Sequence, residues 1–324
     1  MPEHFVDRLT AAIAEKRAPV CVGVDPLYER LPEALAAEAD GPQARLEAMR
    51  QFCQGVIEEV APHVPAVKVQ SAYFEAYGAD GVALYEHVVG YARHQGLIVI
   101  GDVKRNDIGS TAGAYARGHL AGRPGSGSDA GVADAVTVNP YFGIDGIQPF
   151  LDVAAETGRG VFALVRTSNP SAAEVQDLAD AGGQKVYQHV ADRLAEWGDG
   201  EGLCGQSGWS LLGAVVGATW PAEAAELRKR MPRQVFLVPG YGAQGASAAD
   251  CAAAFEAGGG AIVNASRSVL YAAPQAGDTW RSAVGRGQGR RWWSWSRRRR
   301  RRSLRRRRGR RRRGRGRAAG RRVG

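Results

Sequence analysis

Cysteine is scarce in this chain, with 4 residues in 324. Cys21, Cys53, Cys204 and Cys251 lie far apart, and no two of them form a C-x-x-C pair. That spacing argues against a metal cluster, and so few cysteines do not build a disulfide scaffold. We therefore expect reduced thiols in a cytoplasmic protein.

Long apolar runs are missing as well. No segment reaches the roughly 20 apolar residues that are needed to span a bilayer. The first 16 residues carry the charges of Glu3, Asp7, Arg8, Glu15 and Lys16. They therefore lack the uninterrupted apolar core that a signal peptide needs. The sequence therefore predicts neither a membrane association nor a secretory leader.

Acidic residues and lysines are absent from positions 286–324, and this absence changes the meaning of the formal net charge of +10. That segment holds 21 of the 43 basic residues, all of them Arg. Residues 1–285 therefore carry 22 basic against 33 acidic residues, a net charge of −11. The basic excess belongs to one tail, while the body of the chain is acidic.

The body alternates short β-branched runs with segments of helical periodicity. Strands are predicted at 19–24, 66–69, 97–102, 135–138, 161–165, 211–216, 235–238 and 261–264, and helices at 43–60, 81–94, 144–157, 184–197, 221–231 and 247–257. Continuous apolar strands joined by helices are typical of a parallel sheet. Eight of them most simply close into a (β/α)8 TIM barrel, a single α/β domain over residues 1–285. A doubly wound open sheet is the structural alternative.

Polar residues gather at the predicted strand ends, where barrel enzymes place their active sites. Those at or just after a strand are Asp25, Lys68, Asp102, Lys104, Asn139, Thr167, Ser168, Gln244 and Arg267. Asp102 and Lys104 are two residues apart, so in a strand they share one face. Asp107 is expected to return toward them from the following turn.

A lysine between carboxylates stays charged, which makes Lys104 a proton donor and a poor Schiff-base nucleophile. The structural alternative for this cluster is a surface ion-pair network at a strand end.

Two segments fit the pattern G-x-G-x-x-G, at 200–205 and at 240–245. The first follows a helix and precedes a strand, so it is interpreted as a loop without function. The second follows a strand, but no acidic residue ends a strand about 20 residues later to bind a ribose. In barrels the loops after the seventh and eighth strands commonly bind phosphate. Arg267 follows the eighth strand, so a phosphate site is predicted there.

Eight motifs in this order resemble the orotidine 5'-monophosphate decarboxylase family, in particular its longer bacterial branch. They are VGVDP (22–26), VKVQSAYFE (67–75), DVKRNDIGST (102–111), TVNP (137–140), TSNP (167–170), GATWP (217–221), VPGYGAQG (238–245) and NASR (264–267). The resemblance covers residues 5–273. It implies conversion of orotidine 5'-monophosphate to uridine 5'-monophosphate, the last step of pyrimidine synthesis, without a cofactor or a metal.

The resemblance also implies catalytic roles. Lys104 matches the lysine that protonates C6 of the pyrimidine as carbon dioxide leaves, and Asp102 matches the carboxylate beside the substrate carboxylate. Lys68 matches the second lysine of the charged array, with a buried ion pair as the structural alternative. Asp107 and Thr111 match positions that reach the neighbouring subunit's site, which implies a homodimer with shared active sites.

Four further residues match substrate-binding positions of the family. Asp25 resembles the ligand of a ribose hydroxyl, Ser168 the contact of the pyrimidine amide, and Gln244 with Arg267 the phosphate-binding pair. A turn or helix cap is the alternative for Asp25, and a turn before a proline is the alternative for Ser168.

Two other functions stay open at this point. One is a Mg²⁺-dependent decarboxylase or aldolase of sugar phosphates, a class that shares D-x-K-x-x-D but needs a further acidic ligand. The other is nucleic-acid binding by the tail, where Trp292, Trp293 and Trp295 stand beside arginine runs. We interpret residues 286–324 instead as a disordered segment from a frameshift near residue 285, because they show no apolar periodicity. They stand where the family continues a closing helix.

Overall fold

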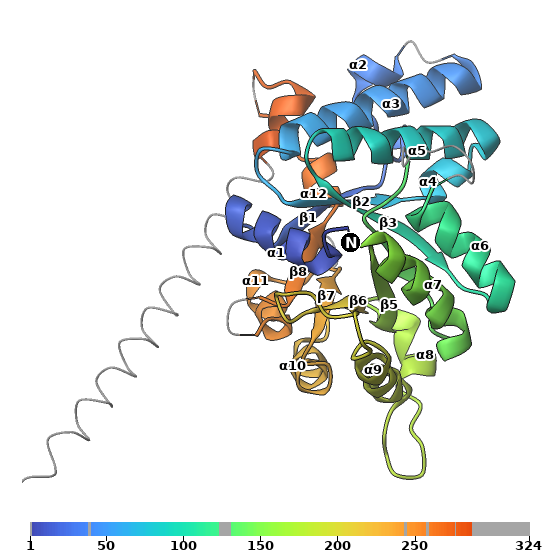
Figure 1. Ribbon diagram of the computed structural model, residues 1–324. Coiled ribbons are helices and arrows are strands. Elements are labelled where there is room, and N and C mark those ends of the chain that lie inside the picture. Colours follow the sequence, from blue (N-terminus) through green and yellow to red (C-terminus); the bar gives the residue numbers. More distant parts are fainter. Residues whose placement is uncertain are drawn as a thin grey trace, which may run out of the picture.

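In the computed structural model, eight parallel strands close into a barrel in the order of the chain (Figure 1). The structure describes residues 2–37, 40–122, 131–242, 245–256, 259–275 and 277–286. The strands are β1 (Val20–Val24), β2 (Ala66–Gln70), β3 (Ile98–Arg105), β4 (Ala135–Val138), β5 (Gly160–Arg166), β6 (Ser210–Val216), β7 (Gln234–Val238) and β8 (Ala261–Ala265). The predicted (β/α)8 fold is confirmed, and each predicted strand is present.

Helices surround the barrel and cover the outer face of the sheet (Figure 1). They are α1 (Phe5–Lys16), α2 (Glu33–Ala36), α3 (Gly41–Val60), α4 (Ala72–Glu75), α5 (Gly78–His94), α6 (Gly109–Leu120), α7 (Ile144–Thr157), α8 (Ala173–Gln176), α9 (Val186–Trp197), α10 (Pro221–Arg230), α11 (Ala248–Cys251) and α12 (Arg267–Leu270). Short 3₁₀ turns lie at η1 (Tyr28–Arg30), η2 (Pro170–Ala172) and η3 (Ala252–Ala254). With both faces covered, nearly every strand residue is buried. No helix in the described ranges combines the length and apolar character of a bilayer span.

Several segments differ from the predicted helices, and the short helices α2, α4, α8 and α12 were not predicted. The helix expected over 247–257 is reduced to α11 and η3, because Phe255 takes an extended backbone with φ −96° and ψ 142°. Helix α6 was not predicted, since Gly109, Gly113 and Gly118 weaken its helical pattern. Helix α1 was not predicted either.

Helix α1 closes the amino-terminal end of the barrel. Phe5, Val6 and Leu9 are buried in one cluster with inward-facing residues of the strands. The rings of Phe5 and Phe162 meet edge to face, with centroids 5.9 Å apart. A Cβ atom at Gly160 would lie 2.2 Å from the Phe5 ring, so the close approach requires glycine. The opposite, carboxyl-terminal end is left for the functional site.

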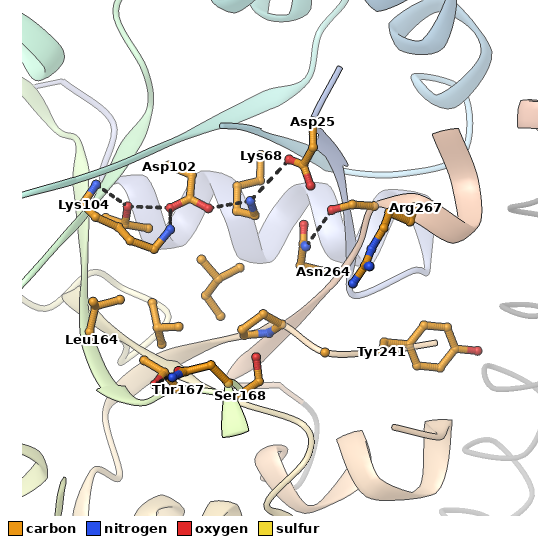
Figure 2. A pocket seen from close by; sticks show the side chains of 17 residues that line it. Asp25, Lys68, Asp102, Lys104, Leu164, Thr167, Ser168, Tyr241, Asn264 and Arg267 are labelled. Carbon is orange, nitrogen blue, oxygen red and sulfur yellow. Dashed lines mark hydrogen bonds and ion pairs between the residues drawn. The ribbon is translucent and has the colours of Figure 1, made fainter. Parts of the chain in front are cut away.

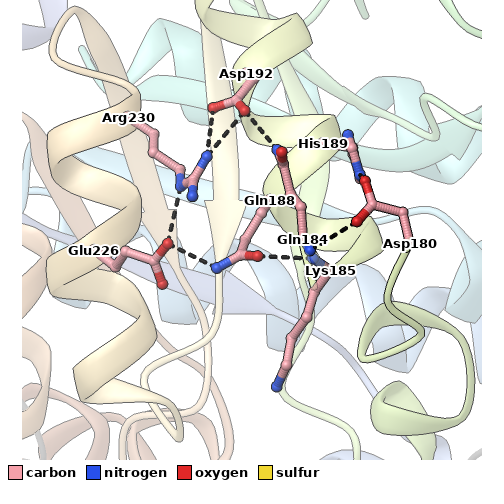
Figure 3. A network of polar contacts seen from close by, with 8 residues as sticks. All are labelled: Asp180, Gln184, Lys185, Gln188, His189, Asp192, Glu226 and Arg230. Atoms are coloured by element: carbon pink, nitrogen blue, oxygen red, sulfur yellow. Dashed lines mark hydrogen bonds and ion pairs between the residues drawn. The ribbon is translucent and has the colours of Figure 1, made fainter. Parts of the chain in front are cut away.

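A network of polar side chains fixes the long excursion between β5 and α9 (Figure 3). Gln184 donates to Asp192 at 2.7 Å, and Gln188 donates to Glu226 of α10 at 2.7 Å. Arg230 contacts both acidic residues at 2.9 Å. This excursion begins with the loop that follows β5 at the functional end of the barrel.

The described part of the chain ends in a packed helical segment, residues 280–286. The Trp280 ring lies 5.4 Å from the Phe52 ring, Arg281 pairs with Glu58 at 2.5 Å, and Val284 is buried. The start of a closing helix is therefore present. Residues 287–324 lie outside the described residues, so the disordered tail and the domain boundary at 285 stay predictions.

Candidate active site

A cavity of about 460 Å³ lies at the carboxyl ends of the strands, the end at which barrel enzymes bind substrates. Six of the nine predicted site residues line it. They are Asp25, Lys68, Asp102, Lys104, Ser168 and Arg267. They come from β1, β2, β3, the loop after β5 and the start of α12, so closure of the barrel brings together residues that are far apart in the sequence.

Asp102 lies between two lysines (Figure 2). Its Oδ2 atom is 2.6 Å from Nζ of Lys68, on the neighbouring strand β2, and its Oδ1 atom is 2.5 Å from Nζ of Lys104. The Thr137 hydroxyl of β4 donates to the same Oδ1 atom at 2.9 Å. The prediction that Asp102 and Lys104 share one face is confirmed, and the carboxylate has defined partners on both oxygens.

Neighbouring charges keep Lys68 and Asp102 ionised although both are buried. Burial acts to raise the pKa of Asp102, but the charges of Lys68 and Lys104 and their hydrogen bonds outweigh it, so the pKa is lowered. Burial acts to lower the pKa of Lys68, but the charges of Asp102 and Asp25 outweigh it, so the pKa is raised. Lys68 and Asp102 are each 6% exposed, and both carry a charge at neutral pH.

Lys104 has an unusual backbone for a residue with a side chain, with φ +43° in the left-handed region. The pairing of β3 with β4 shifts register between Gly101 and Arg105, so Lys104 lies within an irregular end of the strand. Its N–H donates to the Thr137 hydroxyl at 3.0 Å. The strained conformation turns the Lys104 side chain, which is 46% exposed, into the mouth of the cavity.

Asp25 follows β1 and presents one oxygen that can accept a hydrogen bond. Among the described residues, its buried Oδ1 atom has no hydrogen-bond partner, and Nζ of Lys68 is 3.8 Å away. The hydroxyl of Tyr271 donates to the Asp25 carbonyl at 3.1 Å and accepts from the N–H of Leu27 at 2.8 Å. Tyr271 therefore fixes the backbone, while the carboxylate faces the cavity.

Ser168 lies on a loop that a buried arginine supports. Arg166 ends β5, is fully buried, and has its guanidinium 4.2 Å from the Trp220 ring and 3.2 Å from Asp177. Trp220 in turn donates to the Thr167 carbonyl at 3.0 Å. These contacts hold the start of the loop and place Ser168 at the cavity wall.

The loops after β7 and β8 form the other end of the cavity. Gly240, Tyr241 and Arg267 line it. Gly240 has φ +106°, a conformation that favours glycine and allows the backbone N–H groups of the turn to face a ligand. Arg267 is exposed at this rim, and Gln244 lies outside the described residues. An exposed cation beside a glycine turn suits an anion.

The prediction that Asp107 returns toward Lys104 is wrong for the two residues of one chain. Asp107 does not line the cavity, and its carboxylate accepts from the N–H of Ile108 at 2.8 Å. Thr111, exposed on α6, is also outside the cavity. The irregular end of β3 is the physical reason, because it directs the chain after Lys104 away from the barrel and into α6.

Several lining residues were not named as site residues from the sequence, among them Thr137, Tyr241, Asn264 and Ser266. Thr137 was detectable, since it is the one polar residue within the buried strand β4. Asn264 donates to Ser266 at 3.2 Å and accepts from the Cys21 thiol at 3.4 Å, contacts that join three separate positions of the barrel. In the part of the chain that the structure describes, no three His, Cys, Asp or Glu side chains are grouped to bind a metal ion.

Comparison with known proteins agrees with this geometry. Residues 18–281 match the sequence profile described as orotidine 5'-phosphate decarboxylase / HUMPS family. The orotidine 5'-phosphate decarboxylase of Rhodopirellula baltica is 44% identical over 271 residues, which cover 83% of this chain and 88% of the relative. The enzyme of the same name from Deinococcus radiodurans is 44% identical over 273 residues, covering 84% and 91%.

A solved structure supports the same relationship. The Leishmania donovani OMP decarboxylase superposes with a TM-score of 0.66 at 31% identity, over 88% of this chain and 96% of that one. The profile match spans all eight strands of the barrel. The chain therefore belongs to the orotidine 5'-phosphate decarboxylase / HUMPS family.

Proposed function

We propose that the cavity converts orotidine 5'-monophosphate to uridine 5'-monophosphate, with Lys104 as the proton donor. The observation that carries this proposal is the row Lys68–Asp102–Lys104 at the end of the barrel where Gly240 and Arg267 also lie. The row places fixed charges at one end of the cavity, and the other end suits a phosphate. A nucleotide monophosphate carries its reacting ring and its phosphate at opposite ends.

The chemistry needs what these residues supply. Loss of carbon dioxide breaks the bond to C6 and leaves its electron pair on a ring carbon without a conjugated sink. The enzyme must stabilise that carbanion electrostatically and deliver a proton to it. The ammonium of Lys104, held by Asp102 at 2.5 Å, performs both tasks in this proposal. Asp102 disfavours the substrate carboxylate more than the transition state, in which the charge has moved to the ring.

The remaining residues bind the substrate. Asp25 accepts a hydrogen bond from a ribose hydroxyl through its carboxylate, which lines the cavity. Ser168 contacts the pyrimidine amide, and Arg267 with Gln244 binds the phosphate. Binding energy from the phosphate, far from C6, is then available to lower the barrier to decarboxylation.

We further infer that the active form is a homodimer in which Asp107 and Thr111 complete the partner's site. Large apolar side chains are exposed beside Asp107: Ile108, Tyr115, Tyr141, Phe142 and Ile144. They lie directly before α6, on α6, on the loop before α7 and at the first residue of α7. The two helices pack against each other. An exposed apolar patch of this kind suits a second copy of the chain.

The first experiment follows the absorbance of orotidine 5'-monophosphate with purified protein after extensive EDTA treatment. Turnover without metal supports the decarboxylase and eliminates the Mg²⁺-dependent sugar-phosphate enzyme. The variant Lys104→Ala is expected to lose decarboxylation while it keeps the fold. Activity of this variant within about tenfold of the parent would refute the assigned proton donor.

A mixing experiment tests the shared sites. Lys104→Ala and Asp107→Ala are each expected to be inactive alone. A mixed dimer rebuilds one intact site from the Lys104 of one chain and the Asp107 of the other. Random exchange in a two-fold dimer makes half of the dimers mixed, so about a quarter of wild-type activity returns. Mixtures that stay inactive after proven subunit exchange would refute the shared site.

A further inference from the structure

We propose that the ion pair between Glu75 and Arg105 is a positioning device for Lys104, an inference that rests on the proposed function. Neither residue lines the cavity. Arg105 directly follows Lys104 at the end of β3, and Glu75 ends α4. Their side chains meet at 2.5 Å.

The pair joins the two strands that carry the catalytic lysines. Helix α4 begins directly after β2, the strand of Lys68, and the Ser71 N–H between them donates to the Asp102 carbonyl at 3.3 Å. The contact of Glu75 with Arg105 closes a second connection from α4 to β3. The ends of β2 and β3 are therefore held together at two points beside the charged row.

Arg105 also braces the strained backbone of Lys104. One of its N–H groups donates to Glu75, and another donates back to the Val103 carbonyl at 3.1 Å. The guanidinium therefore connects the backbone of Val103, the residue before Lys104, with helix α4. The Arg105 carbonyl accepts from the N–H of Asn139 at 3.0 Å, which ties the same point to the loop after β4.

These contacts restrain the conformation of Lys104, which the contact of its own side chain does not fix. The lysine has a left-handed φ of +43°, and its side chain is half-exposed with Asp102 as its one carboxylate partner among the described residues. A left-handed conformation persists in a residue with a Cβ only when its surroundings impose it. The Thr137 hydroxyl accepts from the N–H of the peptide between Val103 and Lys104, and Arg105 donates to the carbonyl of that same peptide.

The chemistry of arginine suits this task. Its planar guanidinium presents several N–H groups in a fixed fork, so it reaches a carboxylate and a carbonyl at once, whereas a lysine ammonium is a single flexible point charge. Burial acts to raise the pKa of Glu75, but its hydrogen bonds with Arg105 and Ser71 outweigh it, so the pKa is lowered and Glu75 is an anion at neutral pH. The side chains of Arg105 and Glu75 are 28% and 39% exposed, and such surface pairs contribute little to overall stability.

The test compares Arg105→Ala, Arg105→Lys and Glu75→Gln with the wild type in steady-state decarboxylation. The control variant is Arg193→Ala, which breaks an exposed pair with Glu196 of similar length, 2.7 Å, on α9. Displacement of a catalytic group can cost about 100-fold in rate, so Arg105→Ala is expected to lower kcat about 10- to 100-fold. KM, inhibition by uridine 5'-monophosphate, oligomeric state and unfolding midpoint should stay close to wild type.

The other variants identify the mechanism. Arg105→Lys should have a kcat between those of Arg105→Ala and the wild type. Glu75→Gln should have a kcat closer to wild type than Arg105→Lys, because its amide oxygen still accepts a hydrogen bond from Arg105. Arg193→Ala should leave kcat unchanged. A kcat of Arg105→Ala within twofold of wild type would overturn the inference, and so would a loss that tracks unfolding or dimer dissociation. A folded wild-type protein without turnover refutes the proposed function itself and is therefore a separate result.

Discussion

Replacing Asp102 by asparagine should destabilise the protein strongly, because it leaves a lysine charge in a buried site. The amide keeps the size of the carboxylate and can still accept from Thr137. It removes the ion pairs with Lys68 at 2.6 Å and with Lys104 at 2.5 Å. Among the described residues, Lys68, which is 6% exposed, then keeps as its ion-pair partner only Asp25 at 3.8 Å.

The magnitude follows from burial. Removing one partner of a buried ion pair costs about 3–5 kcal/mol, because the other charge stays uncompensated. The half-exposed Lys104 adds little to this cost. We therefore expect Asp102→Asn to lower the free energy of unfolding by about 3 kcal/mol at pH 7. Adding Lys68→Met should restore part of the loss, since no unpaired charge then remains.

Urea unfolding at several pH values measures the effect. The pKa of Asp102 is lowered in the folded protein, so its stabilisation is present above the pKa of the unfolded state, about 3.9, and is lost as pH falls toward the folded value. The difference between wild type and variant should be full at pH 7 and narrow below about pH 4.

The matched control is Asp152→Asn, at an exposed residue of α7 that accepts from Gln148. It should change the free energy of unfolding by less than about 0.5 kcal/mol. An Asp102→Asn variant within about 1 kcal/mol of wild type at pH 7 would refute the argument that Asp102 compensates a buried lysine charge.

Three further predictions concern the phosphate, the tail and the thiols. Arg267→Ala should lower kcat/KM for the nucleotide roughly 10- to 100-fold, because it removes a hydrogen bond to a charged group. Any turnover of the phosphate-free nucleoside should stay unchanged. Equal losses of kcat/KM on both substrates would contradict phosphate binding by Arg267. Deleting residues 286–324 should leave kcat unchanged and remove any nucleic-acid affinity, and a large loss of rate would make the tail part of the enzyme. Burial raises the pKa of Cys21 to about 12 and that of Cys53 further still, so iodoacetamide at pH 8 should label the partly exposed Cys204 in the native protein and spare both. Mass spectrometry of peptides measures the labelling. Labelled Cys21 or Cys53 with an unlabelled Cys204 would contradict the prediction.

The sequence predicted the barrel well because its signals are local. Each strand is a short apolar run, and buried parallel strands need no alternation of polar residues. Helices with clear periodicity, such as 144–157, were placed to the residue. Helix α6 was missed because three glycines dilute its pattern, and packing against α7 stabilises it instead.

The sequence predicted the part of the site that follows from the geometry and order of the strands. The two-residue spacing of Asp102 and Lys104 determines that they share a face, and the order of the strands brings Lys68 beside them. Only the tertiary structure decided where Asp107 lies, because the left-handed turn at Lys104 redirects the chain and no residue type announces it. The sequence by itself determined that Asp25, Lys68, Asp102, Lys104, Ser168 and Arg267 gather at the end of the barrel. The tertiary structure decided which of them touch, through contacts of Thr137, Arg105 and Glu75 that connect separate elements and have no local signature.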